Sequence, residues 1–111
     1  MIGPIFEVET VERGSRRQVV VRGEIDLKTA PELDEALDGL KADPLVVDMT
    51  DVTFIDSTGL RVLVMARSRV EGDGGRFVVC AADGSAVVRT MRLAGVASDF
   101  HVVASCDELP E

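Results

Sequence analysis

Residues 48–60 read DMTDVTFIDSTGL, and they lie between two apolar segments of different periodicity. Before them, residues 45–47 form a continuous apolar run, which is typical of a strand covered on both faces. After them, apolar side chains recur at helical spacing up to the glycine-rich turn 72–75. The inward residues of that helix are Leu60, Leu63, Val64 and Val70, and Arg61, Arg67 and Arg69 are expected to face solvent. The sequence therefore predicts a buried strand, a loop over residues 50–56 and an amphipathic helix.

Two short β-rich segments precede this unit. Residues 5–10 and 18–22 flank a polar, glycine-containing turn at 12–16, a pattern that predicts a β-hairpin. Residues 23–26, Gly-Glu-Ile-Asp, are interpreted as a polar exit from the second strand.

A first helix is expected after this exit. It is capped at or near Thr29, has Pro31 in its first turn, and is broken by Asp43-Pro44. Its apolar stripe, at positions i, i+3, i+4 and i+7, consists of Leu33, Ala36, Leu37 and Leu40.

The last third of the chain predicts a strand at 77–80, a helix beginning near 83–85 and a short strand at 101–103. Gly95 is the expected stop of this helix, and its inner face comprises Val87, Val88, Met91 and Ala94. Residues 105–111 are long enough for only about one turn of helix.

The resulting order, β-β-α-β-α-β-α-β, predicts an α/β fold in a single domain over residues 1–111. Right-handed βαβ crossovers make the later strands parallel, and the hairpin adds an antiparallel strand at one edge. We expect a mixed sheet with helices packed on it.

The composition narrows the class of function. The net charge of −8 argues against direct binding to nucleic acid or to an anionic membrane, and most of the excess acid lies in residues 1–56. That charge is consistent with a solvated surface or with a face for a basic partner. No apolar run approaches the ~20 residues of a membrane span, and the N-terminus lacks the features of a secretory signal. An acidic, monomeric, cytoplasmic protein is expected.

The two cysteines, Cys80 and Cys106, do not suggest a disulfide framework in a chain of this size. Cys80 ends an apolar run and is interpreted as a small buried hydrophobic residue. Because His101 is the only histidine and no spacing suits a metal, no metal site is expected. A reducing compartment fits this cysteine content.

An acid, two hydroxyls and a glycine stand at the start of the central helix: Asp56, Ser57, Thr58 and Gly59. One interpretation is an ordinary helix cap, which stabilises a protein by about 1 kcal/mol. The other is a hydroxyl that gains and loses a phosphate, since a helix N-terminus favours anions. A glycine in the first turn costs about 1 kcal/mol relative to alanine, so Gly59 is interpreted as clearance for a partner.

Catalysis is not supported by the residues available. Ser57 lacks the G-x-S-x-G context of a hydrolase nucleophile, and His101 lies on a short apolar strand. Glu24 and Asp26 form an acid pair with no evident cleft, and residues 72–75 lack the Gly-Lys-Ser/Thr end of a P-loop. We therefore expect neither enzymatic activity nor a cofactor.

The stretches Gly23-Glu24-Ile25-Asp26, Asp48-Met49-Thr50 and 54–60, FIDSTGL, resemble the anti-sigma factor antagonists of the STAS domain family (sulphate transporter and anti-sigma antagonist). The order of elements also resembles that family over nearly the whole chain. The resemblance implies that Ser57 is phosphorylated by a cognate anti-sigma factor, an ATP-dependent serine kinase. Thr58 is its neighbour and the less favoured acceptor.

The resemblance implies a partner switch. The unphosphorylated protein would bind the anti-sigma factor and free a sigma factor, phosphorylation would end binding, and a PP2C-type serine phosphatase would reset the protein. The partner surface would comprise Glu24, Asp26, Asp56, Thr58, Gly59 and Arg61. Arg61 departs from the small residue of many relatives, and residues 107–111 replace the usual C-terminal helix with a stub. The alternative is a STAS module that acts as a scaffold in another assembly, such as a stress-signalling complex or a lipid-transport accessory.

Overall fold

The computed structural model describes residues 6–14 and 16–109. It contains every strand and helix of the predicted order, with two additional short 3₁₀ helices. The predictions for Ile5, Ser15 and residues 110–111 lie outside the described residues. The elements are β1 (Phe6–Arg13), β2 (Arg16–Ile25), α1 (Ala30–Leu37), β3 (Leu45–Ile55), α2 (Ser57–Gly72), β4 (Phe77–Cys80), α3 (Ala86–Leu93), η1 (Ala97–Asp99), β5 (His101–Val103) and η2 (Cys106–Glu108).

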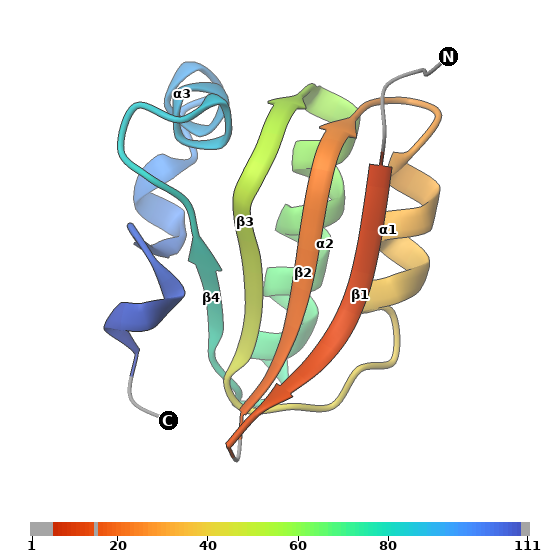
Figure 1. Cartoon of the computed structure of the whole chain (residues 1–111), viewed down its shortest axis with the longest axis vertical. Coiled ribbons are helices and arrows are strands. Elements are labelled where there is room, and N and C mark those ends of the chain that lie inside the picture. The colour runs from red at the N-terminus through yellow and green to blue at the C-terminus, as the bar shows by residue number, and fades with distance from the viewer. Residues whose placement is uncertain (1–5, 15, 110–111) are drawn as a thin grey trace.

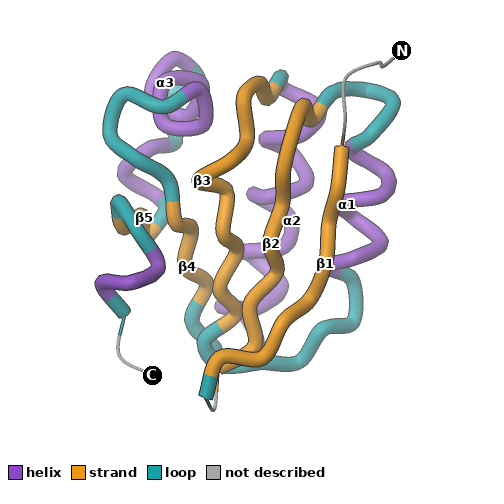
Figure 2. The backbone as a smooth tube through the Cα atoms, in the orientation of Figure 1, coloured by secondary structure: helices purple, strands orange, loops and turns teal. Residues whose placement is uncertain are grey.

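The five strands form one mixed sheet in the order β1-β2-β3-β4-β5. β1 pairs with β2 in the antiparallel sense, and the other neighbours are parallel. Helices α1 and α2 lie together on one face of the sheet, behind the strands in Figures 1 and 2. This arrangement confirms the predicted α/β fold with an N-terminal antiparallel hairpin.

The alternation of side chains along β3 divides the core into two parts. Leu45 and Val47 belong to the large cluster that also includes the inner faces of the helices. Val46 points to the opposite face, where it joins a small cluster with Val78, Cys80 and Cys106. Residues 45–47 are all fully buried, as predicted for a strand covered on both faces.

Three strands are longer than predicted. β1 continues to Arg13 and β2 begins at Arg16, so these strands extend into the turn expected at 12–16. The prediction of a loop at 50–56 is wrong, because β3 continues to Ile55. The prediction that the chain leaves the sheet at 23–26 is wrong for residues 23–25, because β2 ends only at Ile25. These polar extensions pair with each other, with Glu24 opposite Phe54 and Ile25 opposite Ile55. This long-range pairing supplies the backbone hydrogen bonds, so the segments need no apolar pattern of their own.

Helix α1 is shorter than predicted. It ends at Leu37, before Asp43-Pro44, since Gly39 adopts a left-handed φ of +76° immediately after it. Leu33 and Leu37 are buried, but Ala36 is only partly buried and Leu40 lies beyond the helix. Thr29 precedes the helix without capping it through its side chain.

Some inner and outer positions of the other helices also differ from expectation. Ala94 is exposed, and Val64 is only partly buried. Arg67 lies over the Phe100 ring, 5.5 Å from its centroid, and Arg69 donates to the carbonyl oxygen of Leu37 at 2.6 Å. Both arginines are therefore partly buried, and of the three arginines predicted to face solvent only Arg61 is fully exposed.

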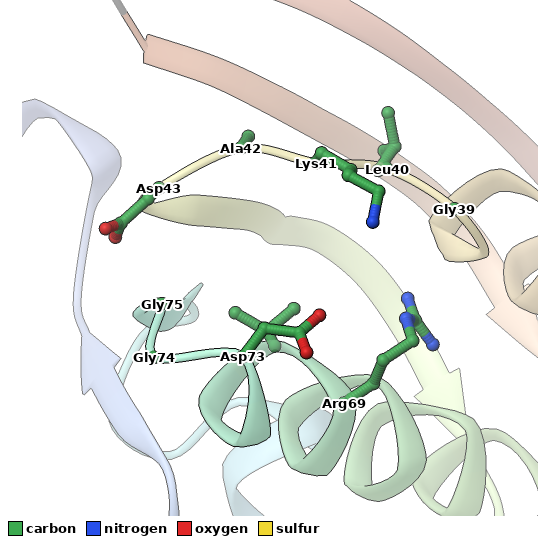
Figure 3. Close-up of a pocket in the computed structure, with 10 residues that line it drawn as sticks. Gly39, Leu40, Lys41, Ala42, Asp43, Arg69, Asp73, Gly74 and Gly75 are labelled. Carbon is green, nitrogen blue, oxygen red and sulfur yellow. The ribbon is translucent and has the colours of Figure 1, made fainter.

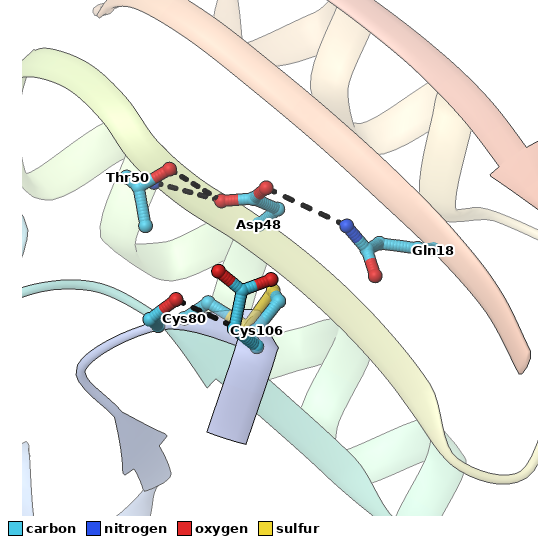
Figure 4. The surroundings of a disulfide bond; sticks show 7 residues. Gln18, Asp48, Thr50, Cys80 and Cys106 are labelled. Atoms are coloured by element: carbon cyan, nitrogen blue, oxygen red, sulfur yellow. Dashed lines mark hydrogen bonds between the residues drawn. A yellow bond between two sulfur atoms is a disulfide. The ribbon is translucent and has the colours of Figure 1, made fainter. Parts of the chain in front are cut away.

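The expectation of unpaired cysteines is wrong. Cys80 and Cys106 form a disulfide that closes a sequence separation of 26 residues, with their Cα atoms 5.4 Å apart. Cys80 ends β4, and η2 folds back over the sheet to bring Cys106 beside it (Figure 4). Only the return of the chain after β5 creates this proximity.

Candidate functional site

The candidate site lies at the carboxyl ends of β2 and β3, which finish side by side. Ile25 pairs with Ile55, and the backbone N–H of Asp56 donates to the Ile25 carbonyl at 3.1 Å. Asp26 and Asp56 thus follow neighbouring strands at the same edge of the sheet, where the chain enters α2 (Figure 1). The sheet therefore brings together two of the predicted site residues that are 30 positions apart in the sequence.

Asp56 caps helix α2. Its Oδ1 accepts hydrogen bonds from the backbone N–H groups of Thr58 at 2.9 Å and Gly59 at 3.1 Å. The first turn of a helix leaves such N–H groups without partners inside the helix, so this carboxylate satisfies two of them. The capping interpretation of the motif is correct for Asp56, and it leaves the function of Ser57 open.

Ser57 is the first residue of α2 and is exposed, whereas Thr58 is partly buried. Within residues 6–14 and 16–109, no hydrogen bond engages the Ser57 hydroxyl. A hydroxyl that is exposed and free of internal hydrogen bonds is accessible to a modifying enzyme. Of the two hydroxyl-bearing residues, Ser57 is the more accessible.

Asp26 organises the loop between β2 and α1. Its Oδ1 accepts from the backbone N–H groups of Lys28 at 2.9 Å and Thr29 at 3.1 Å. The hydrogen bond from the Thr29 N–H is the main reason that the pKa of Asp26 lies below its usual value. Glu24, partly buried, lies just upstream, and its carbonyl oxygen accepts from the Thr29 hydroxyl at 2.8 Å. Asp26 is thereby held as an anion beside the start of α2.

Gly59 has a role other than the predicted one. It is buried, and a Cβ atom at this position would lie 2.5 Å from Cγ2 of Ile25 and 2.9 Å from Cγ1 of Ile55. Both isoleucines are core residues. The interpretation of Gly59 as clearance for a partner is therefore wrong: the missing side chain allows α2 to pack against the ends of β2 and β3.

Four further exposed residues lie on the elements that meet at Ser57, and of these only Arg61 belongs to the predicted partner surface. Leu27, next to Asp26, is 75% exposed, and Phe54, near the end of β3, is 47% exposed. On α2, Arg61 lies one turn after Ser57 and Met65 one turn further, and all three are exposed. The sequence around Leu27, Phe54 and Met65 does not distinguish them from buried apolar residues. Their exposure is recognisable only in the structure.

A hollow of about 610 Å³ lies elsewhere, at the opposite end of α2 (Figure 3). Its lining includes Lys41, Asp43, Arg69 and Asp73, together with the glycines of the turn after α2. Because α2 has 16 residues, its two ends are separated by roughly 22 Å at a rise of about 1.5 Å per residue. The motif therefore presents an outward surface, separate from this hollow.

Of the helices in the described parts of the chain, none combines the length and apolar character needed to cross a bilayer. Within the same residues, no three His, Cys, Asp or Glu side chains are grouped so that they could hold a metal ion.

The profile of the STAS domain matches residues 7–109, which include all the elements that build this edge. The chain belongs to the STAS domain family. Its sequence is similar to the anti-sigma-F factor antagonist RsfB of Mycobacterium tuberculosis, with 35% identity over 88 residues that cover 77% of this chain and 70% of that protein. The anti-sigma-B factor antagonist of Staphylococcus aureus is 36% identical over 62 residues, 53% of this chain and 57% of that protein.

The crystal structure of an anti-sigma factor antagonist from Mycobacterium paratuberculosis superimposes with a TM-score of 0.84 at 27% identity, covering 94% of this STAS chain and 90% of the other. These relatives are all named as antagonists of anti-sigma factors, and none is named as an enzyme.

Proposed function

We propose that this STAS protein is an anti-sigma factor antagonist whose binding is switched off by phosphorylation of Ser57. The main support for the proposal is the Ser57 side chain at the start of α2, which is exposed and whose hydroxyl makes no hydrogen bond within the described residues. The carboxylates of Asp26 and Asp56, which accept backbone hydrogen bonds, lie beside it. The names of the most similar relatives support the same function.

The partner surface in this proposal is the edge around Ser57. Leu27 and Phe54 supply exposed apolar area, and Glu24 and Asp26 supply negative charge. Arg61 adds one positive charge on the exposed side of α2. Apolar contacts provide affinity and the charges provide orientation and specificity, which is the usual composition of a transient protein interface. The partner is an anti-sigma factor that is also a serine kinase.

A phosphate on Ser57 would weaken this interface mainly through charge. It adds about 1.5–2 negative charges to an edge that already carries the carboxylates of Glu24, Asp26 and Asp56. Two unit charges about 6 Å apart at an effective dielectric constant of about 20 repel each other by about 3 kcal/mol before salt screening. A partner carboxylate that pairs with Arg61, one turn from Ser57, would face a repulsion of this order, and each 1.4 kcal/mol is a factor of about ten in affinity. Phosphorylation could therefore lower the affinity for the partner by about 100-fold without any change in the fold.

The capping geometry refines how the fold accommodates the phosphate. The N–H groups of Thr58 and Gly59 already donate to Asp56, so they are not free to hold the phosphate. The N-terminal end of the helix dipole still favours an anion at Ser57. We expect the protein to be a cytoplasmic monomer. Both the kinase and a PP2C-type phosphatase would bind it at the edge around Ser57.

Incubation with candidate anti-sigma kinases and ATP, followed by intact-mass measurement and peptide mapping, tests the proposal. We expect one added phosphate on Ser57, none in a Ser57→Ala variant and an unchanged yield in the matched Thr58→Ala variant. Phosphate that persists in Ser57→Ala would move the acceptor to Thr58. Absence of any phosphate, together with recovery of the chain in large complexes, would favour a scaffold of another assembly.

The binding surface has its own test. Arg61→Ala is expected to change the affinity for the kinase, whereas Arg76→Ala is expected to leave it unchanged. Arg76 is exposed like Arg61, but it lies at the opposite end of the sheet, where it pairs with Asp43 at 3.0 Å. Equal effects of the two substitutions in a binding titration would show that net charge, and not this edge, governs the interaction.

A further inference from the structure

The face of the sheet opposite α1 and α2 is covered in part by the C-terminal segment, and one covalent bond fastens that segment. Cys106 in η2 is joined to Cys80 at the end of β4 (Figure 4). The turn is also ordered internally, since the N–H groups of Glu108 and Leu109 donate to the carbonyl oxygens of Ser105 and Cys106, each at 3.1 Å. The disulfide thus ties a self-contained turn to the sheet.

The turn covers a small apolar cluster. Val46 is fully buried and Val78 is 3% exposed on this face, and Val103 and Leu109 pack against them as partly buried residues. Cys80 is itself a fully buried member of the cluster. Compared with the core under the helices, this cluster has few members, so its burial depends strongly on the position of the turn.

A polar hollow of about 410 Å³ gives access to the disulfide. It lies between η2 and the strands, and its lining includes Cys106, Arg13, Gln18 and Asp48. Cys106 is 8% exposed, whereas Cys80 is fully buried. A small thiol or dithiol that enters the hollow therefore reaches the sulfur of Cys106 first.

We propose that Cys80 and Cys106 form a reversible redox clamp that holds the C-terminal turn on the sheet when oxidised and releases it when reduced. The oxidant is a low-molecular-weight disulfide. One protein thiolate attacks it and expels one thiol, and the second protein thiolate then attacks the mixed disulfide and expels the other thiol. Two protein thiols lose two electrons and two protons, which the two released thiols gain. A dithiol that attacks Cys106 reverses the process.

The clamp is separate from the proposed phosphorylation site. Cys80 pairs with Asp48, and Ile55, next to the motif, lies seven residues further along β3, a distance of roughly 23 Å at about 3.3 Å per residue. Release of the turn is therefore expected to uncover Val46 and Val78 without changing the surroundings of Ser57. This inference does not depend on the proposed function.

Hydrogen exchange read by mass spectrometry tests the clamp on the full chain, prepared once without reductant and once with a reducing phosphine. Alkylation of the non-reduced chain is expected to label neither cysteine. On reduction, the amides of Glu108 and Leu109 are expected to exchange at least ten-fold faster. The amide of Ala81 serves as the internal control, because it donates to the Val103 carbonyl at 2.8 Å and holds β5 without the disulfide.

Two outcomes would overturn the clamp. Alkylation of both cysteines in the folded, non-reduced chain would show that the disulfide does not form. A disulfide whose reduction changes the exchange of Glu108 and Leu109 less than two-fold would show that packing alone holds the turn. The Cys106→Ser variant provides a second comparison without reductant and is expected to match the reduced chain in exchange and in binding of a hydrophobic dye.

Discussion

Substitution of Gly59 by alanine is expected to destabilise the protein, although alanine is the better helix former. On an exposed helix the change would stabilise by about 1 kcal/mol. Here the new Cβ would lie 2.5 Å from Cγ2 of Ile25 and 2.9 Å from Cγ1 of Ile55, both in the core. Overpacking of this kind costs about 1–3 kcal/mol, and two buried neighbours place it in the upper part of that range. The net loss is expected to be about 1–2 kcal/mol.

Urea denaturation followed by circular dichroism measures this difference. Gly72→Ala is the matched control, because Gly72 ends the same helix and its hypothetical Cβ would meet no atom within 4 Å outside its own residue, its chain neighbours and the helix backbone. Gly72→Ala is expected to leave the free energy of unfolding unchanged or to raise it by up to about 1 kcal/mol. In an Ile25→Ala background, which removes the Cγ2 methyl, Gly59→Ala is expected to cost at least about 1 kcal/mol less than in the wild type. A Gly59→Ala protein as stable as Gly72→Ala would refute the packing role.

Three further predictions concern the cap, the anchored acid and the disulfide. Asp56→Ala is expected to lower the free energy of unfolding by about 1 kcal/mol in denaturant titrations, whereas Asp56→Asn, which still accepts hydrogen bonds, is expected to lose less than half of that. The pKa of Asp26 is lowered from 3.8, chiefly by the hydrogen bond from the Thr29 N–H, so its stabilising contribution is complete above pH 3.8 and is lost as the pH falls through the folded-state value. Unfolding curves against pH are therefore expected to show the wild type and Asp26→Asn converging below about pH 4, and a constant difference would contradict this assignment. Replacing Cys80 and Cys106 with serine is expected to destabilise the oxidised chain by about 3.5 kcal/mol, from the loop entropy of a 26-residue separation, and to have no such effect on the reduced chain.

Much of the fold could be predicted from local patterns. The runs 45–47 and 77–80 are strands, and the apolar stripe after Ser57 is a helix that ends at the glycine-rich turn. The ends of the helices and strands were harder to predict wherever pairing with another strand or a change in backbone direction determined them. β2 and β3 extend through polar residues because each supplies hydrogen bonds to the other, and α1 ends at Leu37 because the backbone turns left-handed at Gly39.

The residues of the candidate site could be singled out from the sequence, but their contacts could not. The FIDSTGL motif drew attention to Asp56 and Ser57, and the structure leaves Ser57 exposed while Asp56 caps the helix. The interpretation of Gly59 was wrong, because the sequence alone does not distinguish a glycine required by internal packing from one required by contact with a partner. Leu27 was missed, because the exposure of an apolar residue in a loop depends on what the tertiary structure places over it.

The order of elements, the parallel character of the later strands and the helix N-terminus that presents Ser57 follow from periodicity, turn residues and the handedness of crossovers, all of which are local patterns. Three contacts have no such local origin: the pairing of Ile25 with Ile55, the approach of Gly59 to Ile25 and the disulfide between Cys80 and Cys106. They join residues that are 26 to 34 positions apart, and such residues meet only when the chain closes the loop between them, which no local pattern encodes.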